Sequence, residues 1–241
     1  LLLKADLYQM EGLSDVAREK LLEALNYSDD PLLIFGLSEL DSELENYQEA
    51  IQGYAQLDNR LIYEQTGIST YQRIGFAYAQ LGKFEVATEF LEKALELEYD
   101  DHTAYELASL YFDQEEYQKA VLYFKQIDTI SPDFEGYEYG YSQALHKEHQ
   151  LEEALRIAKQ GLEKNPFETR LLLAASQFSY ELHDASSAEN YLLIAKEDAE
   201  DTEEILLRLA TIYLEQERYE DILDLQSEEP ENLLTKWMIA R

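Results

Sequence analysis

The chain has 241 residues, of which 46% are hydrophobic, with 9 Gly and 4 Pro, as in a folded protein rather than a disordered one. Its 19 Lys+Arg against 51 Asp+Glu give a formal net charge of −32, which repels phosphate backbones and anionic lipids, so we expect no nucleic-acid partner. The absence of cysteine excludes disulfides and thiolate zinc sites, and the absence of a long apolar run predicts no membrane insertion. The acidic surface has two interpretations: a solubility surface, or a field that steers a basic partner.

A small side chain recurs along the chain at nearly constant spacing. The positions are Ala17, Ala50, Ala87, Ala120, Ala154 and Ala188, with Ile222 in the last place. The spacings are 33, 37, 33, 34, 34 and 34 residues. A second register lies three residues upstream, at Ser14, Tyr47, Phe84, Tyr117, Leu151, Ala185 and Tyr219. A third lies seven residues downstream, at Ala24, Leu57, Ala94, Ile127, Gly161 and Ala195. The three registers predict an internal repeat.

Each repeat reads as a helical hairpin. In the fourth repeat, one face of a first helix carries apolar residues at i, i+3, i+4 and i+7, namely Ala104, Leu107, Ala108 and Tyr111. A turn at 114–116 precedes the second helix, and Pro132 ends the unit because proline cannot continue a helix. A small residue in the second helix, such as Ala120, lets the two helices cross closely.

The expected fold class is all-α, with one solenoid of stacked hairpins over residues 1–241. The expected repeats are 1–30, 31–67, 68–100, 101–134, 135–168, 169–202 and 203–230, with part of another at 231–241. Between the second and third repeats, three extra residues around 59–64 should lengthen a helix or bulge the loop, and so bend the stack.

The last segment, 231–241, carries Leu233, Trp237 and Met238, and is less polar than the end of a solenoid. We therefore expect the chain to be a fragment of a longer protein in which more repeats follow. We also expect self-association through this apolar end.

These residues resemble the tetratricopeptide repeat (TPR) family. In the third repeat the matching residues are Tyr71, Ile74, Gly75, Tyr78, Gly82, Phe84, Ala87 and Ala94. In the fourth they are Leu107, Ala108, Tyr111, Tyr117, Ala120, Phe124 and Pro132. The resemblance covers essentially the whole chain. It implies a right-handed superhelix whose first helices line a concave groove, but no particular activity, since the family shares an architecture.

By that resemblance, the second, fifth, sixth, ninth, twelfth and thirteenth positions of each repeat face the groove. The candidate partner-binding residues are Phe35, Gln72, Arg73, Phe76, Tyr105, Phe112, Tyr139, Gln143, Arg170, Gln177, Tyr180 and Arg208. Aromatic side chains supply contact area at low entropic cost, and Gln can donate to and accept from a peptide backbone. Two alternatives remain open: the aromatic residues pack against neighbouring repeats, and the arginines pair with nearby Glu rather than anchoring a carboxylate.

Some members of the family clamp a C-terminal carboxylate with Lys, Asn and Arg from successive repeats. The corresponding positions here hold Tyr105 and Ser109, or Tyr139 and Gln143. We therefore do not expect this chain to bind the C-terminus of a chaperone.

No residue pattern predicts catalysis, a metal or a cofactor. Of the four histidines, His146 and His149 could share a helix face, but no carboxylate lies at ligand spacing. The acidic run 197–204 lacks the glycine and the alternate ligands of a calcium loop. We therefore expect no enzymatic activity.

The function favoured by this sequence is a scaffold or adaptor that binds a protein or peptide in its groove. One alternative is a peptide-sensing regulator whose output module lies outside these residues. Another is an accessory repeat domain of an enzyme or of an envelope-assembly complex. The composition suggests a bacterial, cytoplasmic protein.

Overall fold

A computed structural model describes residues 7–129, 134, 136–199 and 201–228, and within these it contains helices and no strand. The chain divides into two compact units, residues 1–132 and 133–241. Each unit is a stack of helical hairpins, so the all-α helical-repeat solenoid fold is confirmed. That residues 1–241 form one continuous solenoid stays a prediction.

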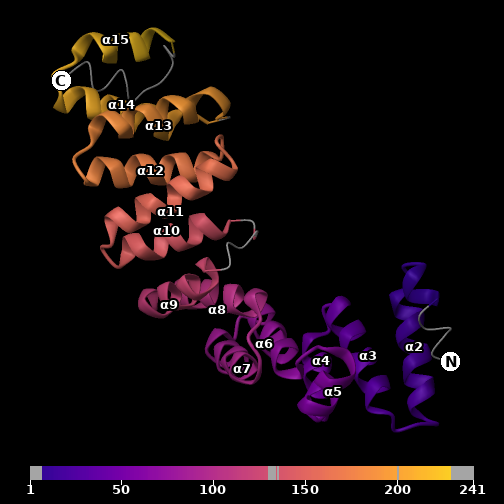
Figure 1. The fold of residues 1–241 in the computed structure, drawn as a ribbon. Helices are drawn as coiled ribbons and strands as arrows, with labels where there is room; N and C mark the ends of the chain where they lie inside the picture. The colour runs from indigo at the N-terminus through magenta and orange to yellow at the C-terminus, as the bar shows by residue number, and fades with distance from the viewer. Residues whose placement is uncertain (1–6, 130–133, 135, 200, 229–241) are drawn as a thin grey trace. The chain divides into compact units, whose positions relative to one another are not determined.

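Within each unit, most consecutive helices pack side by side (Figure 1). Unit 1 contains α2 (Ser14–Leu25), α3 (Pro31–Glu43), α4 (Tyr47–Tyr54), α5 (Asn59–Thr66), α6 (Thr70–Gln80), α7 (Phe84–Leu97), α8 (Asp101–Asp113) and α9 (Tyr117–Asp128). Unit 2 contains α10 (Tyr137–Lys147), α11 (Leu151–Lys164), α12 (Thr169–Glu181), α13 (Ala185–Asp198), α14 (Glu203–Glu215) and α15 (Tyr219–Glu228). The apolar end predicted at Leu233, Trp237 and Met238 lies outside the described residues.

The small-residue register lies in the buried contact between the paired helices. Five of its alanines are 0% exposed, at Ala50, Ala87, Ala120, Ala154 and Ala188. The register three residues upstream marks the first residue of each second helix, namely α2, α4, α7, α9, α11, α13 and α15. Both registers are therefore confirmed as features of the hairpin, one setting the helix start and the other the close contact.

A residue with a left-handed backbone conformation lies two positions before the start of each second helix. The backbone angle φ lies between +58° and +74° at Gly12, Glu45, Gly82, Glu115, His149, His183 and Glu217. The turn needs this conformation even where the side chain disfavours it, as at Glu45 and His149. One expectation was wrong: His149 lies in the turn after α10, so it does not share a helix face with His146.

The three extra residues break a helix rather than lengthening one. The second helix of this repeat, α4, ends at Tyr54, and a new helix, α5, begins after Asp58, whose Oδ1 accepts from the amide of Leu61 at 2.9 Å. Ile62 anchors α5 and is 0% exposed in a cluster with Tyr54 and Ile74. Gly67 ends α5 with φ of 73°. The extension therefore forms a separate short helix beside α6.

No helix in the described part of the chain is long and apolar enough to cross a membrane.

Candidate functional site

All twelve predicted site residues lie on the first helices of the repeats. In each unit separately, we call the surface formed by these helices the first-helix wall of that unit: α3, α6 and α8 in unit 1, and α10, α12 and α14 in unit 2. Ten of the twelve are half-buried, whereas Arg170 is exposed and Phe35 is buried. The contacts of each residue show which of them connect neighbouring repeats and which line a cavity.

Phe35 was predicted to face the groove, and the structure corrects this. Its side chain is 7% exposed and its ring centroid lies 5.9 Å from that of Tyr54, inside the cluster that also contains Ile62. The extra helix α5 adds apolar surface here, so burying the phenyl ring against it is more favourable than exposing the ring to water. Phe35 is a core residue.

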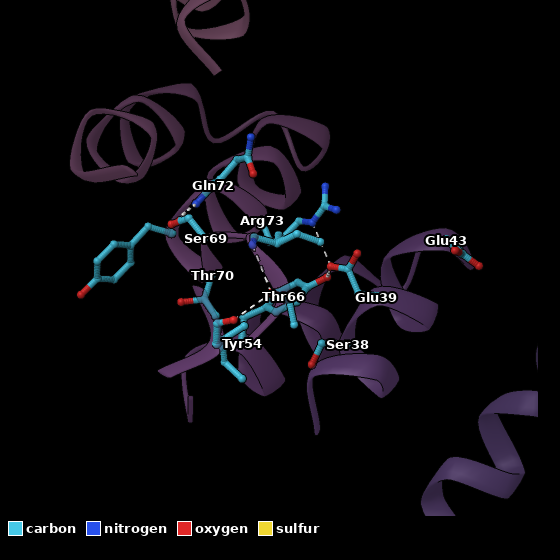
Figure 2. A network of polar contacts seen from close by, with 12 residues as sticks. Ser38, Glu39, Glu43, Tyr54, Thr66, Ser69, Thr70, Gln72 and Arg73 are labelled. Atoms are coloured by element: carbon cyan, nitrogen blue, oxygen red, sulfur yellow. Dashed lines mark hydrogen bonds and ion pairs between the residues drawn. The ribbon is translucent and has the colours of Figure 1, made fainter. Parts of the chain in front are cut away.

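Arg73 forms an ion pair between repeats (Figure 2). Its Nε lies 2.9 Å from Oε1 of Glu39 on α3, although the N–H is poorly aligned for a hydrogen bond. The hydroxyl of Tyr54 donates to the same oxygen, and burial together with the negative charge of Glu39 raises the pKa of Tyr54. These contacts join α3, α4 and α6, which supports the ion-pair alternative for Arg73.

Gln72 and Phe76 connect α6 to the start of α8. The Nε2 of Gln72 donates to Oδ2 of Asp100 at 3.0 Å and to Oγ1 of Thr103 at 2.6 Å. The ring centroid of Phe76 lies 5.6 Å from that of His102, edge to face. Both side chains therefore stabilise the stacking of successive repeats.

Tyr105 and Phe112 pack against the second helix of their own repeat. The ring of Tyr105 lies 6.2 Å from that of Phe124, and the ring of Phe112 lies 5.5 Å from that of Tyr117, both edge to face. Such pairs stabilise by about 0.5–1.5 kcal/mol beyond their buried area. The packing alternative therefore describes these two aromatic residues.

In unit 2, cross-repeat contacts involve charged side chains. The guanidinium of Arg170 lies 5.3 Å from the ring centroid of Tyr139, and its Nη2 lies 3.3 Å from Oε1 of Glu168. Next along the wall, Nε2 of His146 lies within 3.0 Å of both carboxylate oxygens of Glu181. The half-buried Gln143 lies between these two contacts in the sequence of α10.

Glu181 also accepts from Nε2 of Gln177 at 2.9 Å. Burial alone would raise the pKa of Glu181, but the hydrogen bonds from Gln177 and His146 outweigh burial and hold the pKa below its usual range. The ionised carboxylate therefore fixes the orientation of the Gln177 amide at the wall.

Three predicted residues, Gln177, Tyr180 and Arg208, line one cavity between α12 and α14. It has a volume of about 240 Å³ and is also lined by Ser176, Leu192, Leu207, Thr211 and Ile212, so its surface is mostly apolar. Leu192 comes from the second helix α13, and its apolar character alone did not distinguish it from the core of any other repeat. A hollow of this kind can hold an apolar side chain.

The rim of this cavity is polar and held in place. Arg208 donates through Nη2 to Oε1 of Glu204 at 2.5 Å and through Nη1 to the carbonyl oxygen of Leu173 at 3.1 Å. The hydroxyl of Tyr180 bonds to Glu215, and this bond, more than burial, raises the pKa of Tyr180. A guanidinium, a phenol and an amide therefore surround an apolar floor, an arrangement suited to recognising a peptide backbone and one apolar side chain.

Among the described residues, no group of three His, Asp or Glu side chains is placed to hold a metal ion.

Stacked helical hairpins, in which each second helix packs against the next first helix of the same unit, define a helical-repeat protein, a class that generally forms non-catalytic protein-binding scaffolds. A family model for YpiA-like tetratricopeptide repeats matches residues 9–60, and the tetratricopeptide repeat model matches residues 68–101 and 102–134. Residues 9–60 and 68–134 therefore consist of tetratricopeptide repeats.

A curated relative has the same repeats. The TPR repeat-containing protein YpiA of Bacillus subtilis is 28% identical over 229 residues, which is 95% of this chain and 54% of that protein. The chain therefore spans about half the length of this relative.

Solved structures share the fold. The C-terminal part of a TPR repeat-containing protein from Cytophaga hutchinsonii superposes with a TM-score of 0.77 at 14% identity, covering 99% of both chains. YrrB, described as a TPR protein with an unusual peptide-binding site, gives 0.66 at 17% identity over 83% of this chain and 99% of its own. MamA (AMB-1) gives 0.61 at 19% identity over 70% of this chain and 91% of its own.

Proposed function

We propose that this chain is a non-enzymatic scaffold or adaptor of the bacterial cytoplasm that binds a segment of a partner protein on its first-helix wall. The observation that supports this proposal is the cavity between α12 and α14, because Gln177, Tyr180 and Arg208 converge on it from two successive repeats. Most of the other predicted residues on the wall already contact side chains of neighbouring helices. The cavity is therefore the part of the wall best suited to receive a side chain of a partner.

The cavity suits an apolar side chain that projects from an extended or helical segment. Leu207 is 39% exposed and Ile212 is 3% exposed, so the hollow offers apolar surface from rim to floor. Filling it would remove this surface from water, which contributes about 25 cal/mol per Å². The salt-bridged Arg208 and the hydrogen-bonded Gln177 are held in fixed orientations, which lowers the entropic cost of binding.

The charge of the chain favours a basic partner. A net charge of −32 attracts segments rich in Lys and Arg and raises their association rate, while it repels acidic segments. YrrB, which has the same fold, is described as a peptide-binding protein, which agrees with a peptide ligand for this chain.

The test is selection of peptides from a displayed library, followed by affinity measurement by fluorescence anisotropy. We expect Thr211→Trp, which places an indole in the cavity, and Tyr180→Ala each to weaken binding of the selected peptides by about tenfold or more. The matched control is Leu122→Trp, at a side chain 54% exposed on α9, which should leave binding unchanged. Circular dichroism confirms that each variant is folded. Equal affinity for wild type and Thr211→Trp would refute the proposal.

A further inference from the structure

A second cavity, of about 400 Å³, lies in unit 1 between α5 and the connection from α7 to α8. Asn59 and Tyr63 of α5 line one side, and Leu97, Glu98 and Tyr99 line the other. Gln72, one of the predicted partner-binding residues, lines it as well. Its volume falls in the range of about 300–1,000 Å³ that small ligands occupy.

The inserted helix α5 forms a rigid side of this cavity. Oδ1 of Asn59 accepts from the hydroxyls of Ser69 and Thr70 at 2.9 and 3.0 Å, and from the amide of Thr70 at 2.7 Å. These bonds fasten the start of α5 to the start of α6, while Ile62 anchors α5 in the core. The cavity is therefore a consequence of the 37-residue spacing at this repeat, and its walls are held before any ligand arrives.

Two carboxylates, Asp100 and Glu98, supply hydrogen-bond acceptors to the cavity. Oδ2 of Asp100 accepts hydrogen bonds from the amide and the hydroxyl of Thr103, at 2.7 and 2.5 Å, and from Nε2 of Gln72 at 3.0 Å. All three bonds end on Oδ2, so Oδ1 of Asp100 keeps its capacity to accept. The exposed Glu98 takes a hydrogen bond from the hydroxyl of Tyr63, which raises the pKa of Tyr63.

The charges around the cavity do not cancel. Arg60 and Glu64 pair on α5 at 2.9 Å, with side chains 88% and 60% exposed, so they contribute no net charge. Glu98 and Asp100 on the opposite side leave two formal negative charges. Between them, Tyr99 is 48% exposed and Leu97 is 63% exposed, so aromatic and aliphatic surface adjoins the carboxylates.

We propose that this cavity binds an organic cation: an ammonium or guanidinium group on an alkyl chain, supplied either by a Lys or Arg side chain or by a free polyamine. The cationic N–H groups donate to Glu98 and to Oδ1 of Asp100, in charge-assisted hydrogen bonds. The alkyl chain packs on Leu97, and the rings of Tyr63 and Tyr99 attract the cation through their faces. The site is distinct from the cavity of unit 2, and its test does not depend on that cavity.

The test is isothermal titration calorimetry at about 150 mM salt, where long-range charge effects are screened beyond about 8 Å. The probes are spermidine, N-acetyl-arginine amide and a short peptide with one Arg and one Lys. We expect at least one probe to bind with one site per chain, and Glu98→Gln and Tyr99→Ala to weaken it by about fivefold or more. The matched control is Glu96→Gln, an equal charge change on an exposed residue of α7 that does not line the cavity, and it should change affinity by less than about twofold.

The probes also distinguish the two sources of the cation. Tighter binding of the peptide or of the arginine amide assigns the site to a side chain of a partner, and tighter binding of spermidine assigns it to a free amine; both outcomes support the site. Equal weakening by Glu98→Gln and Glu96→Gln, or many weak equivalents bound per chain, would show diffuse attraction to an acidic surface and would overturn the proposal. Absence of any saturable binding by all three probes would overturn it too.

Discussion

Among the described residues of unit 2, Ser179 has a buried side-chain hydroxyl without a hydrogen-bond partner. In the fourth and seventh repeats, the eleventh position holds Tyr111 and Tyr213, whose hydroxyls donate to Glu92 at 2.5 Å and Glu189 at 3.0 Å of the preceding second helices. In the sixth repeat this position holds Ser179, which is 0% exposed and whose hydroxyl finds no hydrogen-bond partner. A buried hydroxyl without a partner loses its bonds to water and gains none in return.

We therefore expect Ser179→Ala to raise the free energy of unfolding by about 1 kcal/mol, measured by urea denaturation. The matched control is Ser142→Ala. Ser142 is also 0% exposed, but its hydroxyl donates to the carbonyl oxygen of Tyr139 at 2.9 Å, so its loss should lower stability by about 1 kcal/mol. A loss of stability in both variants would contradict this account of Ser179.

Glu189 links stability to pH. Arg218 donates to its two oxygens at 2.6 and 3.0 Å, and these bonds outweigh burial and lower the pKa of Glu189. Burial and the bond to Glu189 raise the pKa of Tyr213 to about 12, so the phenol remains a donor at neutral pH. Because the pKa of Glu189 is lower in the folded state, its stabilisation is present above the unfolded pKa and is lost as pH falls through the folded pKa.

We therefore expect Glu189→Gln to lower the free energy of unfolding at pH 7. Below about pH 4, where the carboxyl group is protonated in the unfolded state, the free energies of unfolding of the variant and of wild type should differ less. Urea denaturation at several pH values measures this difference. The control is Glu197→Gln, at an exposed residue of α13. A difference for Glu189→Gln that stays constant with pH would rule out the ionised bond as its source.

At the scale of the helices, stability depends on how closely each pair crosses. An added Cβ at Gly75 of α6 would lie 2.6 Å from Cδ2 of Leu91 and 3.2 Å from the carbonyl oxygen of Ala87, both on α7. Real Cβ atoms essentially never lie within 3.0 Å of another atom, so either the buried Leu91 side chain or the two helices would have to shift. Gly36 of α3 differs, because an added Cβ there meets nothing within 4 Å.

We expect Gly75→Ala to lower the free energy of unfolding by about 1–3 kcal/mol through overpacking. Gly36→Ala should instead raise it by about 0.5–1 kcal/mol, because alanine favours the helix and nothing obstructs its methyl group. Thermal and urea unfolding of the two variants measure both effects. Stabilisation by Gly75→Ala would show that the α6–α7 crossing is looser than the structure describes.

At the scale of the whole molecule, charge is the dominant feature. The excess of acidic over basic residues gives a net charge of −32, and like charges within one folded chain repel each other more than they do in the expanded unfolded chain. Ion pairs such as Arg73 with Glu39 offset only part of this repulsion, because the 19 basic residues are outnumbered by 51 acidic ones. Stability should therefore depend on ionic strength.

We expect the thermal midpoint at pH 7 to rise by several degrees between about 20 and 500 mM NaCl, because the Debye length falls from roughly 20 Å to below 5 Å. The control is the same titration near pH 4.5, where many carboxylates are protonated and the repulsion is weaker, so that the rise should be much smaller. A midpoint that falls with salt at pH 7 would mean that attractive pairs outweigh the repulsion.

The repeat and the close helix crossings could be predicted from the sequence because both depend on local volume. A small side chain every 33 to 37 residues, as at Ala87 and Ala120, is needed wherever two helices cross closely, whatever the rest of the chain does. The second register even marked the first residue of each second helix, as at Phe84. These features require only neighbours within one hairpin.

Only the tertiary structure decided which wall residues contact neighbouring helices and where the cavities lie. Phe35 became a core residue because α5 covers it, and Arg73 an ion-pair partner because Glu39 of the preceding repeat lies within reach. The cavities beside Tyr180 and Tyr63 each arise from segments that are distant in sequence. A pattern along one helix reports which face is apolar, whereas a cavity is the space left when side chains of several helices fail to fill the gap between them, and that depends on their mutual packing.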